Sequence, residues 1–190
     1  MNQVANLVPS GETVLELGCG QGILVKKIAD RCQKMIGVDY DERKCGMARK
    51  ACKNFPNVTI VQMDILSFLE SVSASSVDIA ILADTLASNH LENQDKILTE
   101  CQRILKKNGM IVLKIMDVHP KWKFRLSRLV SSLVYKVLRL SVSNNQQLFH
   151  QSSTLYVAKL RSLGFETKII PLHQISHNPF SHLVICGFLR

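Results

Sequence analysis

The stretch that decides the fold reads ELGCGQG and runs from Glu16 to Gly22. It ends an apolar run, Thr13 to Leu17, that predicts a strand, and it precedes Ile23 to Cys32, where apolar residues recur at helical spacing. Glycines that join a strand to a helix let backbone N–H groups approach a ligand without side chains in the way. The stretch therefore predicts a ligand-binding turn at the carboxyl end of the first strand.

The spacing of the glycines narrows the class of ligand. Gly18, Gly20 and Gly22 form the pattern GxGxG, whereas the dinucleotide fingerprint GxGxxG requires a glycine at the position of Ile23. Glu16 stands two residues before the first glycine, at the end of the predicted strand. The spacing disfavours a nicotinamide-dependent oxidoreductase, which stays as an alternative enzyme class.

Strand-like and helix-like segments alternate through most of the chain. Strands are predicted at residues 13–17, 35–38, 58–63, 77–83, 110–116, 166–172 and 183–189, and helices at 23–32, 42–54, 66–72, 91–107 and 152–163. Asn108 and Gly109 are expected to stop the helix over 91–107. The alternation is typical of an α/β fold with a doubly wound, seven-stranded and mostly parallel sheet. With 46% hydrophobic residues, the chain is expected to form one domain over residues 1–190.

A helical insertion is expected after the fifth strand, over residues 118–150. Within it, residues 122–140 have the apolar periodicity of an amphipathic helix, and residues 121–139 carry six basic side chains and no acid. The simplest interpretation is a lid whose apolar face covers the binding site. A basic amphipathic helix can instead make peripheral contact with an anionic membrane or hold RNA phosphates.

The net charge of +9 lies entirely in the last part of the chain. Basic and acidic residues are balanced at 14 each through Asp117, whereas residues 118–190 contain ten basic residues and one acid, Glu166. Charge segregated in this way is an argument about an anionic partner rather than about the fold.

The cysteine pattern and the hydropathy of the chain indicate the cellular compartment of the protein. The six cysteines include no CxxC pair, so no metal site is expected and a reduced interior is predicted. No stretch is long and apolar enough for a membrane-spanning helix, and the first residues lack the pattern of a signal peptide. A cytoplasmic protein is therefore expected.

The nine residues VLELGCGQG, which end at Gly22, resemble the first motif of the class I S-adenosylmethionine-dependent methyltransferases, in particular small-molecule members of the type 11 kind. The likeness continues in order along about residues 11–117. It implies a Rossmann-like methyltransferase fold and S-adenosyl-L-methionine as the cofactor.

The resemblance also implies roles for acids at the strand ends. Asp39, in IGVDYDE, resembles the acid that accepts hydrogen bonds from both ribose hydroxyls, and Asp64, in VQMDI, resembles the acid that binds the adenine amine. Asp84, in ILADTLASNHL, falls where the family places residues near the methionine part or the acceptor. The cofactor-binding residues expected on this basis are Glu16, Gly18, Cys19, Gly20, Gly22, Asp39, Tyr40, Asp64, Ile65 and Asp84.

Methyl transfer from a sulfonium requires few catalytic side chains. Much of the catalysis comes from alignment of donor and acceptor, and a general base is needed only where the acceptor must lose a proton. His90 is the candidate catalytic base, because small-molecule members of the family carry a histidine in a similar context; capping of the following helix is its alternative role. One contact is also plausible among five histidines of the basic third, His119, His150, His173, His177 and His182.

The sequence favours a methyltransferase that acts on a small or lipophilic acceptor. An RNA methyltransferase is the alternative within the class, because the basic residues suit phosphates, although signatures for handling a flipped base are absent. A non-catalytic cofactor-binding domain and an NAD-dependent oxidoreductase are the alternatives outside it. The oligomeric state and the acceptor atom are left open.

Overall fold

The computed structural model describes residues 1–116, 148–172 and 182–190. The helix expected over residues 122–140 and most of the insertion expected over 118–150 lie outside the described residues, as do His119, His173 and His177. Within the described ranges, no helix has both the length and the apolar character needed to cross a membrane.

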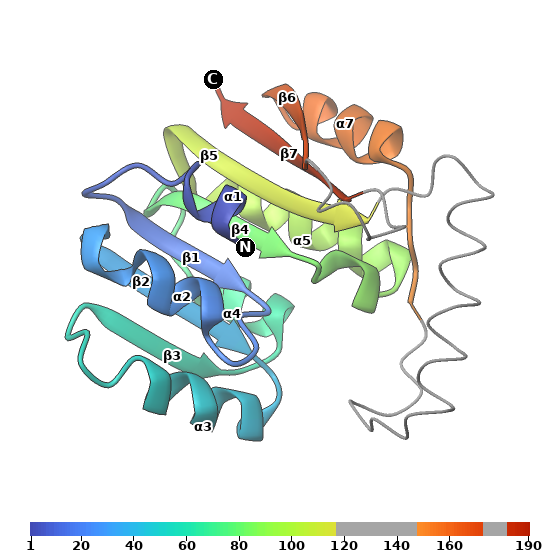
Figure 1. Cartoon of the computed structure of the whole chain (residues 1–190). Helices are drawn as coiled ribbons and strands as arrows, with labels where there is room; N and C mark the ends of the chain where they lie inside the picture. Colours follow the sequence, from blue (N-terminus) through green and yellow to red (C-terminus); the bar gives the residue numbers. More distant parts are fainter. Residues whose placement is uncertain (117–147, 173–181) are drawn as a thin grey trace.

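One sheet contains seven strands in the order β3-β2-β1-β4-β5-β7-β6 (Figure 1). Its strands are β1 (Thr13–Leu17), β2 (Lys34–Asp39), β3 (Val58–Gln62), β4 (Val77–Ala83), β5 (Leu105–Met116), β6 (Phe165–Pro171) and β7 (His182–Leu189). The first five run parallel to one another, and β7 lies antiparallel between β5 and β6. The doubly wound, mostly parallel α/β sheet predicted from the sequence is confirmed.

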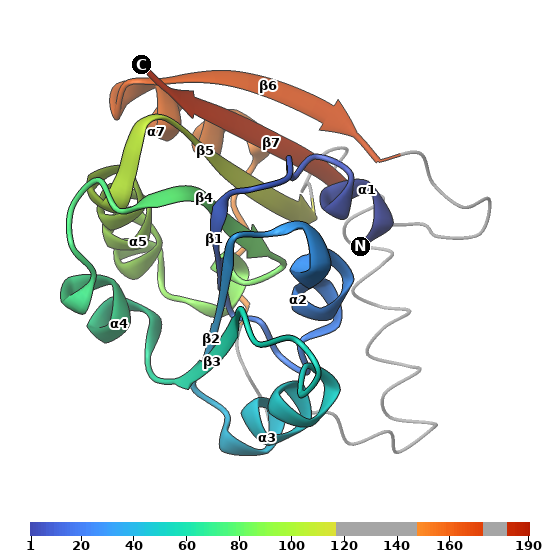
Figure 2. The same cartoon turned by 90° about the vertical axis from the view of Figure 1, so that its left-hand side faces the viewer.

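Helices cover both faces of this sheet (Figure 1, Figure 2). One face carries α1 (Asn2–Ala5), α2 (Ile23–Ile28) and α3 (Glu42–Ala51), and the other carries α4 (Ile65–Ser71), α5 (Leu91–Ile104) and α7 (Ser153–Ser162). Short 3₁₀ helices follow α2 at Ala29–Arg31 and precede α5 at Leu86–Ser88. Each face therefore has its own hydrophobic core, as a buried parallel sheet requires.

Strand β1 contributes to both cores. Val14 packs into the core on the α2 side, whereas Leu15 and Leu17 pack into the core on the α4 and α5 side. This division follows from the pleat, because successive side chains of a strand point to opposite faces. The same alternation places Glu16 on the side of α2, where its carboxyl group accepts a hydrogen bond from the backbone N–H of Val25.

Helix α5 ends earlier than the sequence indicates. The predicted helix through Lys107 is wrong at its end, because α5 stops at Ile104 and β5 begins at Leu105. Leu105 is buried and pairs with Val77 of β4, after which the register between the two strands shifts. Asn108 has a φ of 64° in this irregular part of β5 rather than behind a helix. Burial of Leu105 in the sheet outweighs the local preference of its lysine neighbours for helix.

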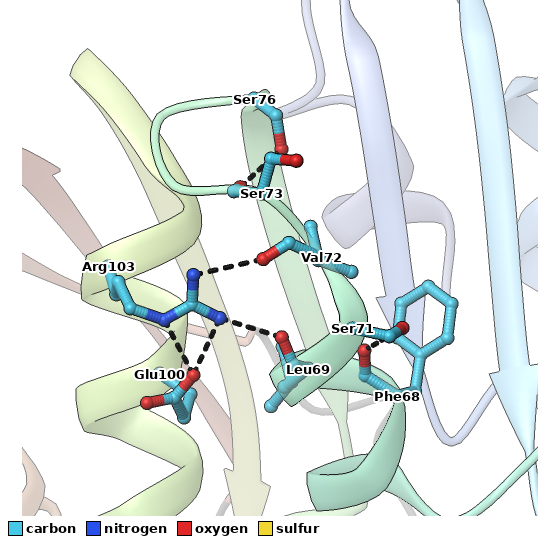
Figure 3. A network of polar contacts seen from close by, with 8 residues as sticks. All are labelled: Phe68, Leu69, Ser71, Val72, Ser73, Ser76, Glu100 and Arg103. Carbon is cyan, nitrogen blue, oxygen red and sulfur yellow. Dashed lines mark hydrogen bonds and ion pairs between the residues drawn. The ribbon is translucent and has the colours of Figure 1, made fainter.

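An arginine joins α4 to α5 across the second face (Figure 3). The guanidinium of Arg103 donates hydrogen bonds to the Leu69 carbonyl at 2.7 Å and to the Val72 carbonyl at 2.9 Å, and its Nε donates to Glu100 at 2.7 Å. The last carbonyls of a helix lack partners within it and form the negative end of its dipole. Arg103 satisfies two carbonyls at the end of α4 and thereby fixes that helix against α5.

Candidate functional site

The glycine turn lies at the switch point of the sheet. β2 and β3 extend the sheet on one side of β1, whereas β4 and β5 extend it on the other. In open α/β sheets, ligands bind outside the carboxyl ends of the strands at such a point. The turn over residues 18–22 follows β1, and Asp84 and Thr85 follow β4, so both segments border this position.

Two of the glycines let the turn pack closely against its neighbours. Gly18 has a φ of 76°, and a Cβ there would lie 2.4 Å from Oγ1 of Thr85. Gly22 has a φ of 75°, and a Cβ there would lie 2.9 Å from the Cβ of Ala48 in α3. The Thr85 hydroxyl donates a hydrogen bond of 2.9 Å to the Leu17 carbonyl. Thr85 was missed by the sequence interpretation, and its signal was a polar residue beside Asp84 at a strand end.

Asp39 and the glycine turn are in direct contact. Oδ2 of Asp39 accepts a hydrogen bond of 2.8 Å from the Gly20 N–H, and Oδ1 accepts one of 3.0 Å from the Asp41 N–H. The Asp39 side chain is buried, yet a Cβ at Gly20 would meet no atom within 4 Å. The arrangement places a buried carboxyl group beside backbone that is open to a ligand.

Glu16 is buried close to the same turn. Burial, with a smaller contribution from the nearby Asp39, raises the pKa of its carboxyl group to about 8 against the opposing effect of the Val25 N–H. Among the described residues, Oε2 of Glu16 has no hydrogen-bond partner. A buried oxygen without a partner is costly, so this atom is suited to a donor or a positive charge from a ligand.

The other expected cofactor residues lie along the same edge. Asp64 follows β3 and begins α4, where its Oδ1 accepts hydrogen bonds from the N–H groups of Leu66 at 2.9 Å and Ser67 at 3.2 Å. Ile65 is half-buried against the core, and Tyr40 is exposed beside Asp39. The structure thus orders these side chains along the ends of β1, β2 and β3.

Cys19 has a structural role in the turn. Its side chain is buried, and Sγ would lie 3.0 Å from a Cβ at Gly37 of β2. Burial, with help from Glu16 and Asp39, raises the pKa of the Cys19 thiol. The thiol therefore stays protonated and acts as packing beneath the turn.

Asp84 is held in an uncommon backbone conformation. Its φ is 60°, which few residues other than glycine adopt, and its N–H donates a hydrogen bond of 2.9 Å to the Lys114 carbonyl. Its carboxylate forms an ion pair with Nζ of Lys114, and Nδ1 of His182 lies 3.9 Å from Oδ1. Local strain of this kind occurs where the surrounding structure fixes a residue, often at functional sites.

A cavity of about 190 Å³ adjoins Asp84. Its lining residues are Asp84, Leu86, Ala87, Lys114, Ile115, Met116, Leu148, His150, Gln151, Tyr156 and His182. These residues come from the ends of β4 and β5, the 3₁₀ helix over Leu86–Ser88, the start of β7, the segment that leads into α7, and α7 itself. The cavity is mostly apolar, with its charged groups contributed by the strand ends.

His90 lies apart from this lining. It occupies the N-terminal cap position of α5 without a capping hydrogen bond from its side chain, and it is exposed. Its ring packs against Phe149 with centroids 4.3 Å apart and a tilt of 39°. Among the described residues, His150 and His182 are the histidines that line the cavity. Both belong to the basic third of the chain, as the sequence allowed.

A buried glutamine organises the wall of the cavity and was not anticipated. Gln94 is fully buried, and its Nε2 donates hydrogen bonds of 2.8 Å to the carbonyls of Asn89 and Phe149. Its Oε1 accepts from the Tyr156 hydroxyl at 2.7 Å and from Gln151 Nε2 at 2.9 Å. The sequence does not distinguish Gln94 from a solvent-exposed polar residue of α5. Its four partners are either far away in the sequence or in the loop before the helix, so no local pattern reveals them.

Comparison with known proteins identifies the family of this chain. The family model described as methyltransferase domain matches residues 9–166, which is most of the chain. The chain belongs to this methyltransferase family. The family resemblance read from VLELGCGQG is therefore confirmed.

Individual relatives of this methyltransferase match over parts of their length. A probable S-adenosylmethionine-dependent methyltransferase of Mycolicibacterium smegmatis is 31% identical over 104 residues, which are 55% of this chain and 38% of that protein. A ubiquinone biosynthesis O-methyltransferase of Dechloromonas aromatica is 21% identical over 183 residues, covering 90% of this chain and 71% of the relative. The chain thus spans well under half the length of the first of these relatives.

Solved structures share the fold of this methyltransferase over nearly its whole length. A methyltransferase from Archaeoglobus fulgidus has a TM-score of 0.77 at 15% identity, covering 98% of this chain and 90% of its own. The N-methyltransferase NodS of Bradyrhizobium japonicum, in complex with S-adenosyl-L-homocysteine, has a TM-score of 0.71 at 16% identity, covering 97% and 80%. These likenesses establish the fold.

We expect Glu16 to make the stability of this protein depend on pH. The folded chain holds a proton on Glu16 up to about pH 8, whereas the unfolded chain releases it near the ordinary pKa of 4.5. Protonated Glu16 therefore contributes fully to the free energy of unfolding at low pH. This contribution is lost as the pH rises through the folded pKa, by at most about 1.4 kcal/mol per pH unit. Urea unfolding between about pH 5 and pH 8 should give a flatter profile for Glu16→Gln than for the wild type. Parallel profiles would contradict the assignment.

Gln94→Leu should destabilise the fold by about 2–4 kcal/mol, because it leaves buried carbonyls and a hydroxyl without partners. Tyr156→Phe is the matched control, since it removes one bond of the same network and should cost about 1 kcal/mol. Urea unfolding at one pH measures both values. Equal losses in the two variants would show that Gln94 does not organise this wall.

Proposed function

We propose that this methyltransferase binds S-adenosyl-L-methionine and transfers its methyl group to a small or lipophilic acceptor by in-line displacement. The observation that carries the proposal is the hydrogen bond from the Gly20 N–H to Asp39, which joins an open glycine turn to a buried carboxylate at the switch point. Membership of the methyltransferase family supports it, as do relatives named as probable S-adenosylmethionine-dependent methyltransferases.

The residues at the turn fit this cofactor. Each oxygen of Asp39 accepts one backbone hydrogen bond and can accept another, so the carboxylate can bind a ribose diol and keep its contact with the turn. Oε2 of Glu16 is buried without a partner, which suits the positive charge that the cofactor carries. Asp64 and Ile65 extend the same edge toward the position expected for the adenine.

The chain contributes alignment to the reaction. The bound cofactor supplies an electrophilic methyl group on a sulfonium. Gly18 and Thr85 fix the turn on the donor side, and the cavity beside Asp84 holds the acceptor in a defined position. Alignment of two reactants in this way contributes up to about 7–11 kcal/mol.

The nature of the cavity supports an acceptor with an apolar body. Leu86, Ile115 and Met116 contribute apolar surface to it, and a cavity of about 190 Å³ accommodates a compact group. Several relatives are named as ubiquinone biosynthesis O-methyltransferases, which supports an acceptor of this kind. We assign the same class of acceptor to this chain.

The basic residues outside the described ranges bear on the partner of the enzyme. Residues 121–139 carry six positive charges, which would favour peripheral contact with an anionic lipid surface where a lipophilic acceptor resides. RNA is the second anionic partner that such a segment suits.

A cytoplasmic location is part of the proposal, because all six cysteines are free and a reducing compartment keeps them so.

Calorimetry tests the cofactor assignment. The wild type should bind S-adenosylhomocysteine saturably and should not bind NADH. Asp39→Ala should weaken S-adenosylhomocysteine binding by more than about tenfold, or 1.4 kcal/mol, whereas Asp30→Ala, at an exposed position next to α2, should leave the affinity unchanged. NADH binding in place of S-adenosylhomocysteine would overturn the cofactor assignment, and equal affinities for the two variants would refute the ribose role of Asp39.

A labelled methyl donor identifies the class of acceptor. A cell extract incubated with the protein and methyl-labelled S-adenosyl-L-methionine is separated into lipid, small-molecule, protein and RNA fractions. The label should enter the lipid or small-molecule fraction. Label confined to RNA would establish the alternative, and a protein with Asp39→Ala serves as the control for background labelling.

A further inference from the structure

Three charged or ionisable side chains meet at the carboxyl edge of the sheet. Nζ of Lys114 pairs with Oδ2 of Asp84, and Nδ1 of His182 lies 3.9 Å from Oδ1 of the same carboxylate. The register of the sheet brings them together, because Lys114 lies opposite Ala83 in β4 and His182 lies opposite Met116 in β5. The cofactor proposal gives Lys114 and His182 no role.

These three side chains form the charged side of the cavity of about 190 Å³. Asp84 directly precedes Thr85, whose hydroxyl contacts the end of β1, so the charged side is the one next to the glycine turn. The remaining wall includes Leu86 and Tyr156. A ligand that fits this distribution has an apolar body and a polar group that points toward the cofactor side.

We propose that the cavity binds an acceptor with an apolar ring and an ionisable hydroxyl, and that His182 is the base that removes the hydroxyl proton. This inference rests on the methyl-transfer function proposed above. Imidazole is a suitable base near neutral pH when it lies within reach of the substrate. Lys114, whose side chain is 12% exposed, places an ammonium group where negative charge develops on the acceptor oxygen.

The charges around His182 favour its neutral, basic form. Burial lowers the pKa of His182, and the ammonium groups of Lys114 and of the Met1 amino terminus lower it further, while Asp84 opposes them. Besides Asp84, Lys114 and His182, the ionisable groups among the described residues that line this cavity are His150 and Tyr156. The imidazole is therefore available as a proton acceptor at neutral pH.

Methyl transfer in this cavity conserves protons and electron pairs. His182 takes the proton from the acceptor hydroxyl, and an oxygen lone pair forms the bond to the methyl carbon. The carbon–sulfur bond breaks, and its electron pair stays on sulfur, which becomes a neutral thioether. The imidazolium of His182 then releases its proton to solvent, and Lys114 stabilises the oxygen until the new bond forms.

A phenol whose ionisation is visible by absorbance tests this assignment without turnover. The full-length protein is labelled with carbon-13 at histidine, saturated with S-adenosylhomocysteine and titrated with 4-nitrophenol. The apparent pKa of the bound phenol should fall by about one unit or more, a tenfold shift in ionisation. The Cε1 resonance of His182, assigned by its loss in His182→Asn, should move to its imidazolium position as the probe saturates. In His182→Asn, the shift in phenol ionisation should be lost while S-adenosylhomocysteine affinity is kept.

The other outcomes separate this inference from the proposed function. If S-adenosylhomocysteine binds but 4-nitrophenol does not, or binds without moving the His182 resonance, the inference is overturned and the proposed function stands. A response of His150 or His90 in place of His182 overturns it in the same way. Failure of the wild type to bind S-adenosylhomocysteine overturns both.

Discussion

The hydrogen bond from the Thr85 hydroxyl to the Leu17 carbonyl joins the two segments that border the binding edge. It forms because Gly18 has no side chain, since a Cβ there would occupy the place of the Thr85 hydroxyl. β1 and β4 are neighbours where the strand order reverses, so this contact sets the position of the glycine turn relative to Asp84. The proposed cofactor site and the cavity beside Asp84 are thereby placed on one rigid frame.

The two buried acids near the turn are stabilised in different ways. Asp39 accepts hydrogen bonds from two backbone N–H groups, which offset the cost of burying its carboxylate. Glu16 has an oxygen without a partner among the described residues, and its raised pKa shows that burial favours the protonated form. The Asp39 carboxylate can thus accept further hydrogen bonds from hydroxyl groups, and a cationic ligand would give the buried oxygen of Glu16 a partner.

The cavity beside Asp84 is assembled from segments that are distant in the sequence. Gln94 joins α5 to residues 149–151 and to Tyr156 of α7, and the antiparallel pairing of β7 with β5 brings His182 to Asp84. Long-range hydrogen bonds of this kind fix the shape of a cavity that no single segment defines. The shape and charge of the cavity therefore depend on how β7 and the segment before α7 pack on the ends of β4 and β5.

The sequence by itself determined the parallel sheet, the glycine turn and the acids at the ends of β2 and β3, because each depends on local periodicity and on a strand end that the chain marks with glycine or aspartate. It was wrong at the end of α5, where burial of Leu105 against β4 outweighs local helix preference. Only the tertiary structure decided that Thr85 contacts the glycine turn, that Gln94 bonds to the wall of the cavity and that His182 lies near Asp84. It also decided that His90 lies beside Phe149. The physical reason is that these positions depend on contacts between residues far apart in the chain, which no local pattern encodes.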